Sequence, residues 1–340
     1  MRTMVLCFRG VIMRRYIVLI AFVLVWLLPG LLFSHRSKSI RSAEVTETAT
    51  ETTAVTAQFI CVKQPSGVSE MALDDYVLGV VLGEMPASFE HDALKAQAVA
   101  TRTYTLRRIQ RQNKHTDANI CTDAACCQAY ISPANYLLYI GEEADLEKIK
   151  QAVNETVDQV LMYEGNLIES TYFSCSGGKT EDAAAVWGTS VPYLISVSSP
   201  GEEESNYYNK QFLLSKEEFL LKLGLPISTI LSNDNINVKF TAGGGVDQME
   251  IAGAVFSGTE LRALLGLPST VFELTVDGDE IRIHTSGYGH RVGMSQYGAD
   301  AMALVGNSYE EILAHYYPGT ELTTLSKNQM QAIFDKAGNL

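Results

Sequence analysis

The segment GEMP at residues 83–86, followed by the run HDALKAQAVATRTYTLRRIQR at residues 91–111, decides how this chain folds. Residues 73–81 place apolar side chains at helical spacing, which predicts an amphipathic helix with one buried face. Glu84 continues that spacing, so it falls on the apolar face in the last turn. Because a proline disfavours helical backbone at the residue before it, Pro86 predicts the end of the helix there.

A carboxyl group at the end of a buried helix face can act as a general acid. Burial removes water from the carboxylate, so the pKa rises and the neutral, proton-donating form is favoured. The alternative is a glutamate at a helix end whose side chain reaches water, since most carboxylates keep an ordinary pKa. The spacing of Glu84 alone leaves both interpretations open.

The composition is that of an ordered globular protein. The chain has 340 residues, 46% hydrophobic and 19% charged, enough for one large or two ordinary domains. Residues 1–42 hold seven basic side chains and no acidic one, so the remainder carries a net charge of −20 against −13 for the whole chain. Phosphate contacts need clustered lysines and arginines, so this acidic body is a poor nucleic-acid binder.

The N-terminal segment predicts a membrane anchor. Residues 16–33 form an uncharged apolar run close to the length that spans a bilayer. No small-residue cleavage pattern follows, so we favour an uncleaved anchor over a signal peptide. The flanking charges place residues 1–15 in the cytoplasm and the body outside it. Residues 34–58, rich in threonine, glutamate and alanine, predict a flexible stalk.

The body is expected at residues 59–325, with a break between two lobes near 200–210 and a tail at 326–340. Its pattern predicts an α+β fold, in which a helical lobe packs on antiparallel strands and a substrate cleft lies between the lobes. Hairpins are predicted about the turns at 164–166 and 277–279.

A histidine and three cysteines lie within 13 residues, a density typical of metal sites: His115, Cys121, Cys126 and Cys127. This is an accepted zinc ligand set, although the spacing is unlike that of a regular zinc finger. The alternative is a Cys121–Cys127 disulfide, because cysteines outside the cytoplasm tend to pair. In either case the cluster is structural, since four protein ligands leave no position for water. No cofactor is expected for catalysis.

Further candidate binding residues lie on the helix at 91–111 and in two loops. Lys95 and Arg102 share a helix face and would lie one helix away from Glu84. There they would hold an anionic substrate, but they would also lower the Glu84 pKa. The glycine-containing loops at 174–180 and 287–299 allow close approach of a ligand. From these loops we select as candidate substrate-binding residues Ser176, Gly177, Tyr288, His290 and Gln296.

Three stretches in this order resemble the stage II sporulation protein D (SpoIID) family: residues 84–86 with 94–104, residues 172–180, and residues 287–299. The resemblance runs from about residue 59 to 322, behind the expected anchor. This chain departs from the family pattern at two positions. Arg291 replaces a usual glycine, which disfavours a positive φ there. The pair Cys126-Cys127 stands where members often have His-Cys, and both residue types bind zinc.

The resemblance implies a lytic transglycosylase that cleaves glycan strands between N-acetylmuramic acid and N-acetylglucosamine, with Glu84 as the catalytic acid. It implies a preference for strands already stripped of stem peptides by an amidase. It also implies the engulfing membrane around the forespore of a sporulating bacterium as the setting. The expected partners are that amidase and a membrane scaffold protein.

The residues fit this chemistry. Ordinary glycoside hydrolysis needs two carboxylates, and only Glu84 is well placed in the sequence. A lytic transglycosylase needs one, because the 6-hydroxyl of the substrate attacks C1 and leaves a 1,6-anhydro sugar. Stripped glycan exposes a lactyl carboxylate, which Lys95 and Arg102 would bind. Two alternatives stay open: a non-catalytic glycan-binding scaffold, and a hydrolase that pairs Glu84 with a distant carboxylate.

Overall fold

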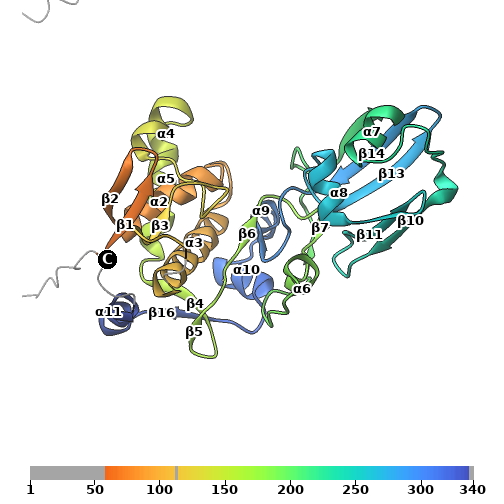
Figure 1. Cartoon of the computed structure of the whole chain (residues 1–340). Helices are drawn as coiled ribbons and strands as arrows, with labels where there is room; N and C mark the ends of the chain where they lie inside the picture. Colours follow the sequence, from red (N-terminus) through yellow and green to blue (C-terminus); the bar gives the residue numbers. More distant parts are fainter. Residues whose placement is uncertain (1–57, 112–113, 337–340) are drawn as a thin grey trace, which may run out of the picture. The chain divides into compact units, whose positions relative to one another are not determined.

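The computed structural model describes residues 58–111 and 114–336 (Figure 1). The predicted anchor at 16–33 and nearly all of the predicted stalk lie outside the described residues. Within the two described ranges, no helix combines the length and the apolar character needed to cross a membrane. The fold there is mixed α+β, as predicted, with ten α-helices and mainly antiparallel sheets.

The helices of the described ranges are α2 (Leu73–Glu84), α3 (His91–Arg111), α4 (Pro133–Tyr139), α5 (Glu143–Glu155), α6 (Ala183–Trp187), α7 (Lys216–Lys222), α8 (Gly258–Leu265), α9 (Gln296–Leu304), α10 (Tyr309–Tyr316) and α11 (Lys327–Lys336), with one 3₁₀ turn, η1 (Asn233–Asn235). The strands are β1 (Phe59–Gln64), β2 (Gly67–Ala72), β3 (Ile120–Cys121), β4 (Gln159–Tyr163), β5 (Asn166–Leu167), β6 (Tyr172–Phe173), β7 (Gly178–Lys179), β8 (Ser198–Ser199), β9 (Lys210–Ser215), β10 (Ile236–Phe240), β11 (Val246–Ile251), β12 (Ala254–Ser257), β13 (Val271–Asp277), β14 (Glu280–Ser286), β15 (Met294–Ser295) and β16 (Glu321–Thr324).

Two hydrophobic cores organise these elements. The first gathers buried side chains from residues 60–194 and 292–333, and we call this region the large lobe. The second gathers buried side chains from residues 219–283, and we call this region the small lobe. The chain therefore leaves the large lobe, builds the small lobe, and returns to complete the large one.

The large lobe is built around α2 and α3 (Figure 1). Helix α2 ends at Glu84 as predicted, but the expectation of a single buried face is wrong. Every residue from Tyr76 to Leu82 is buried, so the middle of the helix is enclosed on all sides. The alanines of α3 are fully buried, and their small side chains let α2, α5 and α9 pack closely against it. The predicted hairpin about residues 164–166 is confirmed as β4–β5, with β16 on the other side of β4.

The small lobe consists of two three-stranded antiparallel sheets, with strand orders β10-β11-β12 and β13-β14-β9. The predicted hairpin about residues 277–279 is confirmed, and Val271 pairs with Ser286 at its open end. Helices α7 and α8 pack against these strands. Leu261 and Leu265 of α8 lie four residues apart and are both buried in the second core, as an amphipathic helix requires.

The expectation of a tail from residue 326 is wrong for residues 327–336. They form α11, which contacts α3 in the large lobe. Met330 and Ile333, three residues apart on one helix face, are buried in the first core. Burial of this apolar face stabilises the helix against the large lobe.

Candidate active site around Glu84

Glu84 is the last residue of α2, and its carboxyl group is largely shielded from water. Its Oε1 atom accepts a hydrogen bond from the backbone N–H of Ala129 at 2.9 Å. Its Oε2 atom accepts one from Nε2 of Gln296 at 3.2 Å. Burial raises the pKa of Glu84 above its ordinary value, and the two hydrogen bonds oppose that rise. The general-acid interpretation of Glu84 therefore has a physical basis in its surroundings.

A pocket of about 540 Å³ opens beside Glu84. All of its lining residues lie between Leu82 and Asp145, within the large lobe. The expectation of a substrate cleft between two lobes is therefore wrong for this pocket, because α2 carries Glu84 to a surface formed by α4, α5 and the segment after α2.

The same pocket contains a second carboxylate, Asp145, which the sequence did not single out. Asp145 lies in the first turn of α5, and its Oδ2 accepts a hydrogen bond from the backbone N–H of Glu142 at 3.2 Å. An acidic residue at that position is common in helix N-termini, so only the tertiary structure shows that it shares a pocket with Glu84.

A buried polar network lies behind Glu84. The Tyr172 hydroxyl donates to Oε1 of Gln128 at 2.9 Å, and Nε2 of Gln128 donates to Oγ1 of Thr105 at 3.1 Å. Burial, followed by the charge of Glu84, raises the pKa of Tyr172 well above its ordinary value, so its hydroxyl stays neutral. Gln128 directly precedes Ala129, so this network also holds the backbone N–H that donates to Glu84.

The expected basic pair does not form a free anion site. Arg102 is fully buried and bonds to Oδ1 of Asp74 at 2.9 Å and to the carbonyl of Thr156 at 2.6 Å. Asp74 lies at the opposite end of α2 from Glu84, so the expectation that Arg102 binds substrate beside Glu84 is wrong. The guanidinium is instead a structural link, since a buried charge needs a paired carboxylate.

Lys95 is also occupied within the protein. Its Nζ lies 3.3 Å from Oδ1 of Asp92 and 3.6 Å from Oε2 of Glu155. It also lies 4.5 Å from the centre of the Tyr309 ring. These contacts contradict the expectation of a basic stripe open to an anionic substrate.

The loop at 174–180 is held by one buried carboxylate, Glu202. Its Oε2 accepts hydrogen bonds at 2.8 Å from the backbone N–H groups of Ser176 and Gly177 and from the Ser176 hydroxyl. Its Oε1 accepts from the hydroxyls of Ser199 and Ser295. Ser176 is fully buried, so its side chain is structural, contrary to expectation, and the N–H of Gly177 is likewise occupied.

The sequence did not identify Glu202 because it lies in a run of three glutamates, and nothing in the run distinguishes the buried one from its exposed neighbours. The sequence analysis placed this run at the expected break between the two lobes, near residues 200–210. In the structure, Glu202 joins the loop at 174–180 to Ser295, within the third stretch that resembles the family.

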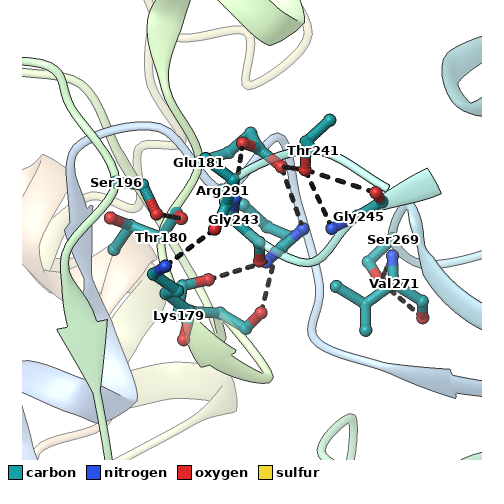
Figure 2. Close-up of polar contacts among 12 residues, drawn as sticks. Lys179, Thr180, Glu181, Ser196, Thr241, Gly243, Gly245, Ser269, Val271 and Arg291 are labelled. Atoms are coloured by element: carbon teal, nitrogen blue, oxygen red, sulfur yellow. Dashed lines mark hydrogen bonds and ion pairs between the residues drawn. The ribbon is translucent and has the colours of Figure 1, made fainter. Parts of the chain in front are cut away.

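Arg291 adopts the positive φ that the sequence disfavours, at 67°. Its guanidinium donates to the carbonyls of Ser176, Lys179 and Gly243 at 2.8, 2.7 and 2.6 Å. It also lies 3.5 Å from Oε2 of Glu181, another buried carboxylate that the sequence did not identify. Figure 2 shows this cluster, in which Arg291 joins the loop at 174–180 to the small-lobe turn containing Gly243. The side-chain contacts offset the strain of the left-handed backbone.

Among the described residues, neither His290 nor Tyr288 forms a hydrogen bond with the Glu84 carboxyl. Burial, with the charge of Arg262 as a smaller cause, lowers the pKa of His290 to about 4, so the imidazole is neutral near pH 7. The His290 ring packs against Phe173 and Trp187, with centroid distances of 5.7 and 5.5 Å. Tyr288 lines a different pocket. Of the loop residues selected from the sequence, Gln296 is the one that the structure brings to Glu84.

The four candidate metal ligands converge. One ligand atom from each of His115, Cys121, Cys126 and Cys127 lies within 4.8 Å of every other. Nε2 of His115 lies 3.4 Å from Sγ of Cys127 and 3.7 Å from Sγ of Cys126, and the two sulfurs are 3.9 Å apart. Tetrahedral zinc with ordinary bond lengths would separate its ligand atoms by about 3.4–3.8 Å. Every cysteine within the described ranges is free, so the alternative Cys121–Cys127 disulfide is not formed.

Comparison with known proteins gives the family. The family model described as stage II sporulation protein, SpoIID, matches residues 62–163, which include Glu84 and all four candidate metal ligands. Stage II sporulation protein D of Bacillus subtilis (strain 168) is 37% identical over 319 residues, covering 88% of this chain and 92% of the relative. The chain belongs to the SpoIID family.

Two further relatives extend the comparison. Stage II sporulation protein D of Bacillus amyloliquefaciens is 38% identical over 75% of each chain. The amidase enhancer of Bacillus subtilis (strain 168) is 32% identical over 72% of this chain and 40% of the relative. The description of the family model and the two relatives named stage II sporulation protein D connect this chain with sporulation.

Proposed function

We propose that this SpoIID-family chain is a lytic transglycosylase that cleaves peptidoglycan glycan strands between N-acetylmuramic acid and N-acetylglucosamine. Strands without stem peptides are its preferred substrate. The observation that carries the proposal is the environment of Glu84, whose carboxyl group has a raised pKa and lies at the edge of a pocket of about 540 Å³.

In the proposed reaction, neutral Glu84 donates its proton to the glycosidic oxygen as the bond from C1 to that oxygen breaks. The 6-hydroxyl of the muramic unit attacks C1 and closes the 1,6-anhydro ring. The Glu84 carboxylate then takes the hydroxyl proton, so one residue serves as acid and as base. Ala129 N–H and Gln296 Nε2–H stabilise the carboxylate that exists between the two transfers.

A two-carboxylate hydrolase is the second candidate, and the position of Asp145 favours it. Asp145 lines the same pocket as Glu84 and would activate a water molecule in place of the 6-hydroxyl. The products differ, because hydrolysis leaves a reducing end and transglycosylation leaves an anhydro end.

The test is to incubate the full chain with denuded glycan and measure the product masses. Anhydro ends that disappear in Glu84→Gln support the proposal. Reducing ends that disappear in both Glu84→Gln and Asp145→Asn support the hydrolase and overturn the proposal. Binding without cleavage would instead identify a glycan-binding scaffold. Asp145→Asn is the matched control, because asparagine keeps an oxygen that can accept from the Glu142 N–H.

We propose that residues 16–33 anchor the chain in the cell membrane, with the body in the space around the forespore. An amidase that strips the glycan and a membrane scaffold protein are the proposed partners, and the relative named amidase enhancer supports the first of these. Protease added to intact protoplasts tests the orientation: digestion of the body supports it, and full protection contradicts it.

We also propose that His115, Cys121, Cys126 and Cys127 hold a structural zinc ion. Bound zinc would cross-link residues 115–127 and thereby fix the segment that presents the Ala129 N–H to Glu84. Metal analysis of the purified chain, with thiol counting, tests this. One zinc per chain and a lower thermal midpoint after chelation support the site, whereas a metal-free chain with unchanged melting contradicts it.

A further inference from the structure

A second pocket, of about 620 Å³, lies away from Glu84 and combines aromatic and basic side chains. We call it the basic pocket and define it by Tyr207, Lys210, Arg262 and Tyr288. None of its lining residues is acidic, although the body of the chain carries a large excess of negative charge. A basic pocket on an acidic protein raises the local concentration of anions.

The aromatic part of the basic pocket is held rigidly. The rings of Tyr207 and Tyr288 lie 4.2 Å apart between centroids. The N–H of Gly287 donates to the carbonyl of Tyr207 at 2.8 Å, and the N–H of Tyr288 donates to the carbonyl of Cys175 at 2.7 Å. Tyr288 nevertheless keeps 44% of its surface exposed. An exposed ring on a fixed backbone offers an apolar face at little entropic cost, which suits a pyranose ring.

The charged part is Arg262 of α8, which is partly buried without a carboxylate partner. Its Nε donates to the carbonyl of Leu267 at 3.4 Å, and no ion pair to it is found among the described residues. Burial lowers its pKa, as expected for a cation without a compensating anion. Every other arginine of the described residues forms an ion pair with a carboxylate: Arg102, Arg107, Arg108, Arg111, Arg282 and Arg291. Arg262 therefore stands apart in having its end groups available for an external anion.

The basic pocket and the Glu84 site share one loop. Tyr288 and Gln296 lie eight residues apart in the stretch at 287–299, and eight residues span at most about 28 Å when fully extended. Gln296 bonds to Glu84, whereas Tyr288 lines the basic pocket. His290 lies between them in sequence, and the charge of Arg262 acts on it. An oligosaccharide of several units is long enough to reach from one site to the other.

We propose that the basic pocket is a second glycan subsite, in which Arg262 binds the free carboxylate of a muramic unit while Tyr288 packs against a sugar ring. The identity of the polymer rests on the proposed function of Glu84. The subsite takes over the role that the sequence assigned to Lys95 and Arg102, which are occupied by internal carboxylates. Stem peptides are amide-linked to that carboxylate, so they remove its charge. The subsite therefore selects stripped strands.

The experiment measures binding of the full chain, carrying Glu84→Gln so that the ligand stays intact, to three oligosaccharides of equal length. They are denuded glycan, denuded glycan with its carboxylates converted to neutral amides, and an N-acetylglucosamine oligomer. Arg262→Ala should weaken binding of denuded glycan by about ten-fold or more, because a charge-assisted hydrogen bond is lost. The same change should leave binding of the two neutral ligands within about two-fold.

The matched control is Arg282→Ala, which removes an arginine of the same lobe that is paired with Asp277 and half-exposed. It should not change binding of any ligand. Tyr288→Ala should weaken all three ligands, because it removes the sugar-stacking surface. Competition with inorganic phosphate tests whether the pocket is a phosphate site. Displacement of glycan only at high phosphate concentration fits a carboxylate site. Tight binding of phosphate that is lost in Arg262→Ala contradicts the proposal.

Unchanged binding of denuded glycan by Arg262→Ala, or an equal loss for charged and neutral ligands, overturns the proposal. Its failure is distinct from failure of the proposed function. If the chain with native Glu84 cleaves glycan and Arg262→Ala leaves glycan binding unchanged, the proposed transglycosylase activity stands and the proposed subsite is rejected. If denuded glycan binds selectively through Arg262 but is not cleaved, the proposed subsite stands and the proposed enzymatic activity is rejected.

Discussion

Glu84 and Glu202 are both shielded carboxylates in loops or helix ends of one protein, yet their surroundings differ sharply. Glu84 accepts two hydrogen bonds, one on each oxygen, and borders a pocket. Glu202 accepts from three serine hydroxyls and from backbone N–H groups, and it is fully buried with no route to a ligand. Glu84 therefore keeps oxygen lone pairs without a hydrogen-bond donor beside an open pocket, whereas the Glu202 oxygens accept hydrogen bonds from several donors each.

This difference separates a carboxylate that can do chemistry from one that holds the fold. A carboxylate that accepts this many internal hydrogen bonds is fixed in place, because moving or replacing it would break several donor contacts at once. A carboxylate with few donors and a high desolvation cost gains a proton at higher pH and can return it to a substrate. Burial by itself therefore does not mark a catalytic acid in this protein.

Glu84→Gln gives the largest expected effect and tests the first half of the comparison. The change should lower glycan cleavage by at least about 10²–10⁴-fold, because it removes the only acid proposed to act on the leaving oxygen. Stability should stay the same or rise slightly, since glutamine occupies the same space without a buried charge. Product release from denuded glycan and thermal unfolding check the two parts. Retained cleavage would remove Glu84 from the mechanism.

Glu202→Gln should do the reverse, with stability as the primary loss. Replacing one oxygen by an NH₂ group sets a donor against serine or backbone donors, which we expect to lower the free energy of unfolding by about 2–4 kcal/mol. Denaturant unfolding measures this. The matched control is Glu203→Gln at an exposed neighbour, expected within about 0.5 kcal/mol of the parent. An equal, small effect of both changes would contradict the structural role of Glu202.

The sequence predicted what depends on local patterns. The apolar spacing before Glu84 and the proline after it predicted α2 and its end, because these follow from helix geometry, whereas the burial of the Glu84 carboxyl stayed open. The density of three cysteines and a histidine predicted a cluster that does converge. Gln296 was selected as a candidate substrate-binding residue, but its contact with Glu84, 212 residues away in the chain, was not predicted.

What the sequence did not predict depends on long-range pairing of charges. Arg102 shares a helix face with Lys95, but its partner Asp74 comes from another helix, and no spacing rule links the two. Asp145 enters the pocket only because α5 packs near the end of α2. Arg291 keeps a positive φ because three carbonyl acceptors from two separate segments, the loop at 174–180 and the turn containing Gly243, surround its guanidinium. In each case the deciding energy comes from tertiary contacts.

Arg291→Gly, which restores the usual family residue, has a smaller expected effect because two contributions oppose each other. Glycine relieves the left-handed backbone by roughly 1 kcal/mol. The change also removes the ion pair to buried Glu181 and three hydrogen bonds to carbonyls, a larger loss. We expect a net loss of about 1–3 kcal/mol in denaturant unfolding. Adding Glu181→Gln should recover part of it, and a gain in stability from Arg291→Gly alone would contradict this account.

Gln296→Ala gives the smallest expected effect. It removes one of the two hydrogen bonds that Glu84 accepts and so makes Glu84 differ even more from Glu202. The Gln296 donor opposes the rise of the Glu84 pKa, so its removal should raise that pKa further. Activity depends on neutral Glu84, so the alkaline limb of the pH–rate profile should move to higher pH.

The pH dependence of the free energy of unfolding should move in the same direction. Since the folded pKa of this carboxyl lies above the unfolded value of about 4.5, stability is lost as pH rises between the two values, and in Gln296→Ala that loss extends to higher pH. Rates on denuded glycan and unfolding midpoints, measured across pH with the exposed Gln211→Ala as control, check both. An alkaline limb that stays in place or moves to lower pH would show that Gln296 does not tune Glu84.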